Sequence, residues 1–326
     1  MLMHPGADAC FGKGEILKSL QRNGRTMLWL CQRIATTLLL AWIVATIVFL
    51  ALHLVPGDPA EVLLSSNGSV ADPTAVAELR SKLGLDRSIL EQYGAFLLGA
   101  LRGDLGNSLV DDYPVMSEIA LRLPRTLELI AAGTLMAMII GVPSGVYAAI
   151  KRGGAFDRIA SATAALLLAV PVFVLGTLLI LLLAQNLRLL PAGGYTSISQ
   201  NASQHFLLLA LPAFAIAKGL AAIVFRITRA SVLDELSRDF VRTARAKGIS
   251  PARVIVHHVL RNALSPVVTV LGLQMGALLG GTVLVEYVFN WPGMSTPLLR
   301  AVESRDYPMV VGIVLTISCL FLLINL

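Results

Sequence analysis

The feature that most constrains this chain is a series of apolar runs of about twenty residues, each long enough to cross ~30 Å of hydrocarbon at about 1.5 Å per helical residue. Only 14% of the 326 residues are charged, whereas soluble domains average about 25%. The sequence therefore predicts an all-α, polytopic membrane protein with six transmembrane helices. The expected spans are Ile34–Val55, Leu127–Ala149, Ile159–Gln185, Phe206–Phe225, Ala263–Val285 and Met309–Leu326.

The positions of Lys and Arg predict the orientation of these spans. With the amino terminus inside, most basic residues fall in cytosolic segments, whereas the two short outer loops hold only Arg188, Arg300 and Arg305. Because cytosolic loops of membrane proteins are enriched in Lys and Arg, both termini are expected in the cytosol. The formal charge of +6 does not indicate nucleic-acid binding, since the basic residues lie between apolar runs rather than on one continuous face. The expected surroundings are membrane lipid.

The segments outside the spans divide the chain further. Residues 1–33 are expected to form a cytosolic tail, with Met1 and Met27 as alternative translation starts, and residues 34–326 the transmembrane domain. The tail does not resemble a cleaved signal peptide, because the long first span follows it intact. An outer loop over about 56–125 contains apolar segments, Leu79–Leu85 and Ile89–Leu101, that predict short helices outside the bilayer.

The inner loop, over about 226–262, predicts a helix, a glycine turn and a second helix. Ser231–Gly248 has an apolar stripe at helical spacing. Gly248 supplies a left-handed stop, and Ser250 and Pro251 then favour the start of a second helix that extends to Leu260. The stripe consists of Leu233, Leu236, Phe240 and Ala244.

Several motifs resemble those of a known family. Arg242–Gly248 (RTARAKG) followed by His258–Pro266 (HVLRNALSP) is similar to the cytosolic signature of binding-protein-dependent ABC importer permeases. Arg242 and Thr243 stand where the wider family has Glu-Ala, and Arg261 where many members have proline; these departures resemble the dipeptide, oligopeptide and nickel branch. Further landmarks of that branch are Pro56–Pro59, Gly103–Ser108, Arg122–Glu128 and Phe289–Gly293. Similar permeases continue past their sixth span into a short tail, so the carboxyl terminus of this chain is either truncated or ends with the span.

The resemblance implies a type I ABC importer permease fold in the inner membrane and a function without catalysis. In that family the loop helix sits in a cleft of a separate ATPase subunit, which binds the ATP and Mg²⁺, so no cofactor is expected on this chain. The implied partners are a second, homologous permease, two cytosolic ATPase subunits and a periplasmic substrate-binding protein. The residues expected to couple to the ATPase are Arg242, Thr243, Ala244, Ala246, Lys247, Gly248, His258 and Arg261.

The residues themselves supply little catalytic chemistry. The nearest match to a phosphate-binding loop, at Gly12, lacks the required spacing and hydroxyl. His257 and His258 are adjacent and point about 100° apart on a helix, so they do not form a metal-binding pair. His53 is expected at the membrane interface. Glu128 and Glu286, at the outer ends of spans two and five, are expected to be solvated.

Two features inside the spans allow alternative interpretations. Lys218 either extends its side chain to the cytosolic edge of the membrane or faces the translocation pathway. Gly272, Gly276 and Gly280 recur at four-residue spacing, which allows close helix packing either within the chain or, as we favour, against a second permease.

The predicted function is import of di- or oligopeptides, with the peptide assignment resting on the resemblance. The same architecture could carry nickel or another small solute. A rival from another class is an ion-coupled secondary carrier, which would need ionisable residues in several spans; Lys218 is the clear candidate there. A membrane-embedded hydrolase lacks a nucleophile or metal set within the spans.

Overall fold

The computed structural model describes residues 31–50, 60–61, 64, 72–82, 84 and 86–325. These residues form helices and loops and contain no β-strand, apart from an isolated bridge between Asn107 and Pro114. The prediction of an all-α chain is confirmed. Residues 1–30 of the predicted tail, His53 and the Pro56–Pro59 motif lie outside the described residues.

Five unbroken helices in the described part of the chain are long and apolar enough to cross a membrane. A sixth crossing results if a bent pair, α6 (Ala155–Ala169) and the helix Val172–Asn186, counts as one span. That second helix consists of α7 (Val172–Leu179) and the π-helix η1 (Ile180–Asn186). The unbroken helices are Cys31–Leu50, α5 (Val115–Ile150), α8 (Ala202–Leu236), Pro251–Gly281 and α14 (Tyr307–Ile324).

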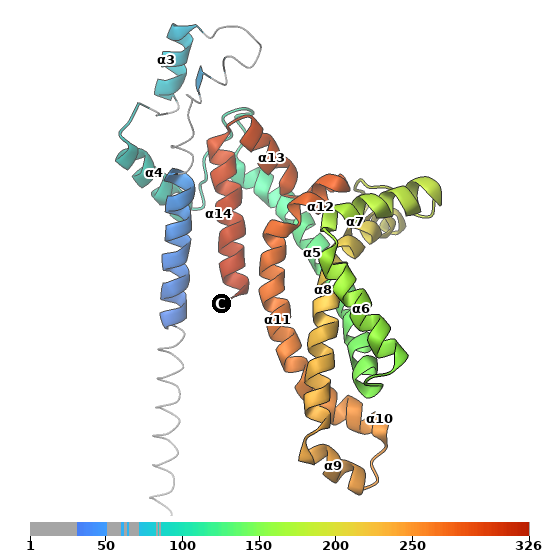
Figure 1. Ribbon diagram of the computed structural model, residues 1–326. Helices are drawn as coiled ribbons and strands as arrows, with labels where there is room; N and C mark the ends of the chain where they lie inside the picture. Colours follow the sequence, from blue (N-terminus) through green and yellow to red (C-terminus); the bar gives the residue numbers. More distant parts are fainter. Residues whose placement is uncertain are drawn as a thin grey trace, which may run out of the picture.

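Shorter helices complete the structure (Figure 1). The predicted Ile89–Leu101 helix coincides with α4, whereas the helix expected over Leu79–Leu85 is displaced toward the amino terminus, because Pro73 starts it and Gly84, with a φ of +68°, follows its end. The remaining elements are α3 (Pro73–Lys82), α4 (Ile89–Leu101), α9 (Asp239–Ala246), α10 (Pro251–Arg253), η2 (Val254–Val259), α11 (Leu260–Gly281), α12 (Val283–Val288) and α13 (Ser295–Glu303).

The helix α8 is the central one. In its most apolar window 72% of the residues are buried, against 39% in α5 and 28% in both Pro251–Gly281 and α14. Its closest neighbour is α5, which approaches along glycines: a Cβ at Gly141 would lie 2.8 Å from the Ala221 carbonyl oxygen, and one at Gly145 would lie 2.8 Å from that of Phe225. The absence of side chains at these positions therefore permits the contact between the two backbones.

A bidentate ion pair joins α6 to α8. The guanidinium of Arg229 donates to both carboxylate oxygens of Asp157, at 2.6 and 2.8 Å, and the Gly153 amide donates to the same carboxylate at 2.9 Å. Asp157 is buried. Because a charged pair of this geometry satisfies most of its hydrogen-bonding capacity, it fixes the start of α6 against α8.

The span predicted over Ile159–Gln185 is not a single helix: α6 and the helix after it meet at 103°. Pro171 lacks an amide hydrogen and disfavours helical geometry at the preceding residue, and Val170 is accordingly extended, with φ −77° and ψ 125°. The break leaves carbonyl groups at the end of α6 without helical donors. The ammonium of Lys218 donates to two of these carbonyls, at Leu167 (2.8 Å) and Val170.

The first helix has few contacts with this bundle. Its carboxyl-terminal end packs on α4, where Thr46 and Tyr93 share a hydrogen bond of 2.5 Å and Phe49 stacks on Phe96 with ring centroids 5.7 Å apart. Large apolar side chains along the rest of the helix, including Leu38 and Ile47, are exposed. Figure 1 shows this helix standing beside the bundle rather than within it.

Replacing Gly141 by alanine should destabilise the α5–α8 contact. The added Cβ would press on the Ala221 carbonyl and on Val224, and overpacking of this kind costs about 1–3 kcal/mol. A matched control is Gly219→Ala on α8, where a Cβ meets nothing within 4 Å. Thermal unfolding in detergent should show a lower midpoint for Gly141→Ala than for Gly219→Ala. Equal midpoints would contradict the proposed close approach.

Replacing Lys218 by methionine should loosen the bend between α6 and α7. The partly buried carbonyls of Leu167 and Val170 lose their donor. A fully buried polar group left unsatisfied costs about 1–3 kcal/mol, which sets the upper bound for each carbonyl. We expect faster amide exchange around the bend in hydrogen–deuterium exchange mass spectrometry. Lys151→Met, at an exposed site, removes the same charge and serves as the control. Unchanged exchange at the bend in Lys218→Met would show that the ammonium does not hold it.

Candidate functional site

The predicted inner loop forms a helical hairpin at one end of the molecule, between α8 and α11 (Figure 1). The single helix expected over Ser231–Gly248 is broken: α8 ends at Leu236 and α9 begins at Asp239. The Ser237 hydroxyl donates to the Asp234 carbonyl at 2.7 Å, and Arg238 is extended with a ψ of 152°. This local hydrogen bond competes with helix continuation, so α9 leaves the axis of α8.

One face of α9 is anchored in a small apolar core. Val241 and Ala244 are buried there against Val232 from α8 and Val254 and Val259 from η2. The other residues of the predicted stripe pack around this core: Leu233, Leu236 and Phe240. The stripe thus holds α9 against both neighbouring helices.

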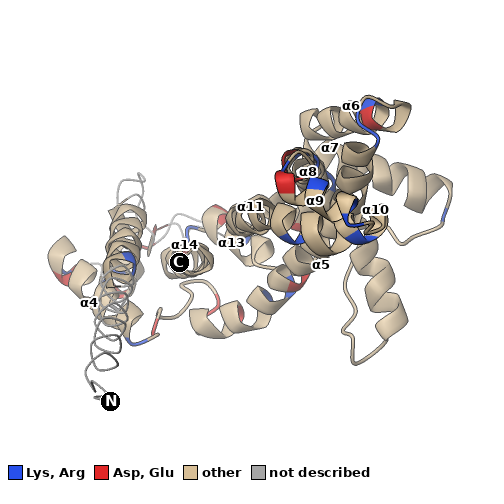
Figure 2. Ribbon diagram, turned by 90° about the horizontal axis from the view of Figure 1, so that it is seen from below, with Lys and Arg blue, Asp and Glu red and all other residues tan. Residues whose placement is uncertain are grey.

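The opposite face of α9 is exposed and basic. The Arg242 side chain is 79% exposed, and its pairing with Asp239, at 3.5 Å, lies between two exposed groups. Exposed pairs of this kind contribute little stability, so Arg242 can exchange this partner for another. Thr243, Ala246 and Lys247 are also exposed. Figure 2, which views the molecule from this end, shows Lys and Arg positions on α9 and α10.

Gly248 makes the turn between the two arms of the hairpin. Its φ is +77°, the left-handed conformation that the sequence predicted, and its amide donates to the Arg245 carbonyl at 3.0 Å. A Cβ at this position would meet nothing within 4 Å. The requirement for glycine therefore comes from the backbone conformation and not from crowding.

The second arm begins at Pro251, as predicted, but does not end at Leu260. It continues through η2 and α11 as one helix, Pro251–Gly281. Ser250 occupies the N-cap position, although its side chain makes no capping hydrogen bond. His258 and Arg261 are exposed on this helix. The arm and the membrane helix are thus a single element.

A buried glutamate, which the sequence interpretation missed, joins the ends of the hairpin. Glu235 accepts from Arg238 Nε at 3.0 Å and from Asn262 Nδ2 at 3.4 Å. It thereby links the end of α8 to the start of α11. Its position three residues after buried Val232, on the apolar side of the helix, was the available signal.

Lys218 lies within α8 and is only 7% exposed. Its ammonium is bound at the α6–α7 bend, which does not fit the interpretation that the side chain extends to the membrane edge. A role in the translocation pathway stays a prediction. Whether or not Lys218 faces the pathway, its hydrogen bonds to the carbonyls at the end of α6 give it a structural role.

The three glycines of α11 do not share one environment. A Cβ at Gly276 would lie 2.7 Å from Asn325 Nδ2 and 2.8 Å from Phe321 in α14, so this glycine packs within the chain. This contact fits the alternative of packing within the chain, and a role of Gly276 at a subunit interface stays a prediction. Nothing lies within 4 Å of a Cβ at Gly272 or Gly280, and their role against a second permease stays a prediction.

The far end of the bundle is organised by Glu286. This carboxylate is 1% exposed, contrary to the expectation that it is solvated. It accepts from Thr126 Oγ1 at 2.6 Å and from the Ser295 amide at 2.8 Å. Burial raises the pKa of the Glu286 carboxyl above its usual range. A Cβ on Gly293 would collide with this carboxylate, which explains the glycine there.

This joint unites two distant sequence motifs, Arg122–Glu128 and Phe289–Gly293. Trp291 is buried, and its indole donates to the Arg125 carbonyl at 3.0 Å. On the same end, His205 Nε2 lies 2.7 Å from Glu128 Oε1, a partner that the sequence interpretation did not anticipate. The landmarks therefore position α5 against the α11–α13 segment.

Two family models match the chain. Residues 141–326 match the binding-protein-dependent transport system inner membrane component, and residues 26–130 match the N-terminal part of such membrane components. The first match contains the hairpin, Glu286 and the Phe289–Gly293 motif, whereas the Arg122–Glu128 side of the joint falls in the second. The second contains the first helix, α4 and the start of α5.

Bacterial transport proteins are similar over most of their length. The glutathione transport system permease protein GsiC of Escherichia coli O6:H1 is 42% identical over 285 residues, covering 87% of this chain and 90% of the relative. The GsiC proteins of Escherichia coli K12 and Pectobacterium atrosepticum are 41% and 43% identical, with 87% of this chain and 90% and 89% of those relatives covered.

These matches agree with the helical hairpin and with the order of the motifs along the chain. The chain therefore belongs to the inner-membrane permeases of binding-protein-dependent ABC importers, in the peptide and nickel branch, and is a multi-pass transport subunit whose ATPase is a separate subunit.

Proposed function

We propose that this permease imports peptides and that the α8–α9–α10 hairpin couples it to the ATPase. The observation that carries the coupling proposal is the hairpin itself, in which a buried face holds α9 to two helices while a basic face stays exposed. Support for a peptide cargo comes from the relatives, whose names specify glutathione, which is a tripeptide.

The contacts of the hairpin allow it to transmit a mechanical force from α9 to the membrane helices. A force on the exposed face of α9 reaches α8 through Val232 and reaches the second arm through Val254 and Val259. Because that arm is one helix from Pro251 to Gly281, displacement at its start is carried toward the far end of the bundle. Glu235, which binds Asn262, links the two paths.

In this proposal the α9 end faces the cytosol, together with both chain termini, and the α13 end faces the periplasm. The complex contains a second homologous permease, two ATPase subunits and a periplasmic substrate-binding protein. ATP and Mg²⁺ bind the ATPase subunits, and this chain holds no cofactor. The open positions Gly272 and Gly280 are the proposed contacts with the second permease.

Family membership removes the ion-coupled secondary carrier from consideration. Within the peptide and nickel branch, small solutes other than peptides are the remaining alternative cargo. A direct measurement of the cargo therefore complements the test of coupling.

Replacing Gly248 by valine should uncouple ATP hydrolysis from uptake. A β-branched residue is strained at a φ of +77°, so α9 and α10 would be displaced relative to each other. We expect uptake by the reconstituted transporter to fall at least about tenfold, which corresponds to 1.4 kcal/mol, while the amount of inserted permease stays unchanged.

The control for this variant is Gly153→Val. Gly153 has a φ of +76°, and a Cβ there also meets nothing within 4 Å, but it lies in the α5–α6 turn outside the hairpin. Unchanged uptake in Gly248→Val, or an equal loss in both variants, would refute the coupling role.

Peptide-loaded binding protein should stimulate ATP hydrolysis by the reconstituted complex. Only a binding protein that holds its solute is expected to favour the transporter conformation that accepts cargo. Stimulation of ATP hydrolysis therefore identifies the class of solute. The measurement compares binding protein incubated with di- and tripeptides against the same protein incubated with nickel or with buffer. Stimulation by nickel alone would contradict peptide import.

A further inference from the structure

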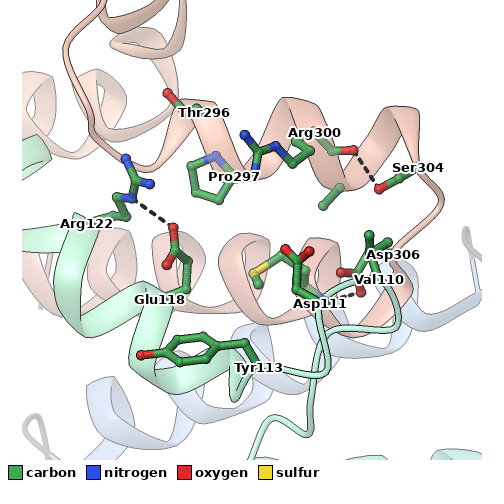
Figure 3. Close-up of a pocket in the computed structure, with 12 residues that line it drawn as sticks. Val110, Asp111, Tyr113, Glu118, Arg122, Thr296, Pro297, Arg300, Ser304 and Asp306 are labelled. Carbon is green, nitrogen blue, oxygen red and sulfur yellow. Dashed lines mark hydrogen bonds and ion pairs between the residues drawn. The ribbon is translucent and has the colours of Figure 1, made fainter. Parts of the chain in front are cut away.

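A pocket of about 400 Å³ lies at the α13 end of the molecule (Figure 3). Its walls come from the loop before α5, the first turns of α5, α13 and the start of α14. Sites for small ligands usually have about 300–1,000 Å³. The pocket is large enough for a small solute and is distant from the hairpin.

Charges of both signs line this pocket. Glu118 and Arg122 pair with each other at 2.8 Å, and Arg122 also donates to the Pro292 carbonyl at 3.4 Å. Within the described part of the chain, the side chains of Asp111 and Arg300 form neither a hydrogen bond nor an ion pair. Figure 3 shows Arg300 lying along α13 on one side of the pocket, with Asp111 on the other.

The wall that carries Asp111 is held in place by buried groups. Asp306 accepts from the Ser108 hydroxyl and from the Leu109 amide, the latter at 3.1 Å. The Ser108 oxygen in turn accepts from the Asp111 amide at 3.1 Å. The loop is thereby fixed to the start of α14, so the Asp111 carboxylate is presented from an ordered backbone.

The opposite wall is equally fixed. Arg300 extends from α13, whose Pro297 and Ala301 are buried against the bundle. A guanidinium can bind a carboxylate through two parallel hydrogen bonds. The pocket therefore offers an unpaired cation and an unpaired carboxylate from separate elements.

We propose that this pocket binds the zwitterionic form of a peptide, with the peptide carboxylate at Arg300 and its ammonium at Asp111. Glu118 and Arg122 neutralise each other, and the Asp306 carboxylate is occupied by the Ser108 hydroxyl and the Leu109 amide. Among the described residues, the charged side chains on the walls that have no partner are therefore Asp111 and Arg300, one of each sign. A ligand with a single charge would pair with only one of these two side chains, whereas a zwitterion pairs with both. The inference rests on the proposed function, because it names a site where the imported solute lodges.

The test uses the complete transporter in lipid nanodiscs, without ATP and without the binding protein. The probe is L-alanyl-L-alanine, and binding is measured by equilibrium dialysis of the labelled peptide. Asp111→Asn and Arg300→Gln should each weaken binding about tenfold, the usual effect of losing one charge-assisted hydrogen bond. Matched controls outside the pocket are Glu303→Gln and Arg102→Gln, which should leave affinity unchanged.

Blocked peptides assign each end of the ligand to a wall. N-acetyl-alanyl-alanine lacks the ammonium, so its affinity should fall with Arg300→Gln and not with Asp111→Asn. Alanyl-alanine amide lacks the carboxylate, so it should show the opposite pattern. The same loss of all probes in both variants would overturn the proposal, and so would wild-type affinities that do not differ among the three probes.

The outcome can be separated from that of the proposed function. If Asp111→Asn and Arg300→Gln bind the dipeptide as the wild type does while peptide uptake continues, the pocket proposal fails and peptide import stands. If the variants bind the dipeptide normally and lose only the stimulation of ATP hydrolysis by the binding protein, the pocket contacts that protein. That result would overturn the proposal of a zwitterion site. Thermal midpoints equal to that of the wild type show that either variant is folded.

Discussion

The close contact between α5 and α8 supports the rest of the structure. Gly141 and Gly145 allow the two backbones to approach, which buries α8 in the middle of the bundle. Polar and charged side chains on α8 then find partners in other elements: Lys218 at the α6–α7 bend, Arg229 at Asp157 and Glu235 at Asn262. A shift of α8 would disturb all of these contacts together, because charged groups removed from water need their partners.

The two ends of the bundle are built for different tasks. The α9 end combines a buried apolar face with exposed basic residues, and the proposed docking of the ATPase rests on this arrangement. The α13 end buries its central carboxylate, Glu286, among donors from α5 and α13 and thereby fixes the walls of the charged pocket. The helices α5, α8 and Pro251–Gly281 extend between these ends.

Sequence patterns succeeded where one physical rule dominates. Long apolar runs predicted the spans, and the glycine after a basic helix end predicted the left-handed turn at Gly248. Sequence patterns gave wrong predictions where a local helix-breaking residue competes with apolar periodicity. Pro171 lies within an apolar run, and the run alone favoured an unbroken span; Ser237 ends α8 although the apolar stripe continues. Glu286 was expected to be solvated because carboxylates at the ends of spans usually are, but Thr126 in α5 and the Ser295 amide at the start of α13 bind it in the interior.

The sequence by itself determined the class of the protein, the approximate spans, the glycine turn and the family, since these depend on local composition and on motifs that can be read in order. Only the tertiary structure decided which buried polar groups find hydrogen-bond or ion-pair partners. Lys218 is stable in the bundle because a bent neighbour exposes its carbonyls, and Gly276 faces α14 whereas Gly272 and Gly280 face open space. Such outcomes depend on which segments meet, and no local pattern contains that information.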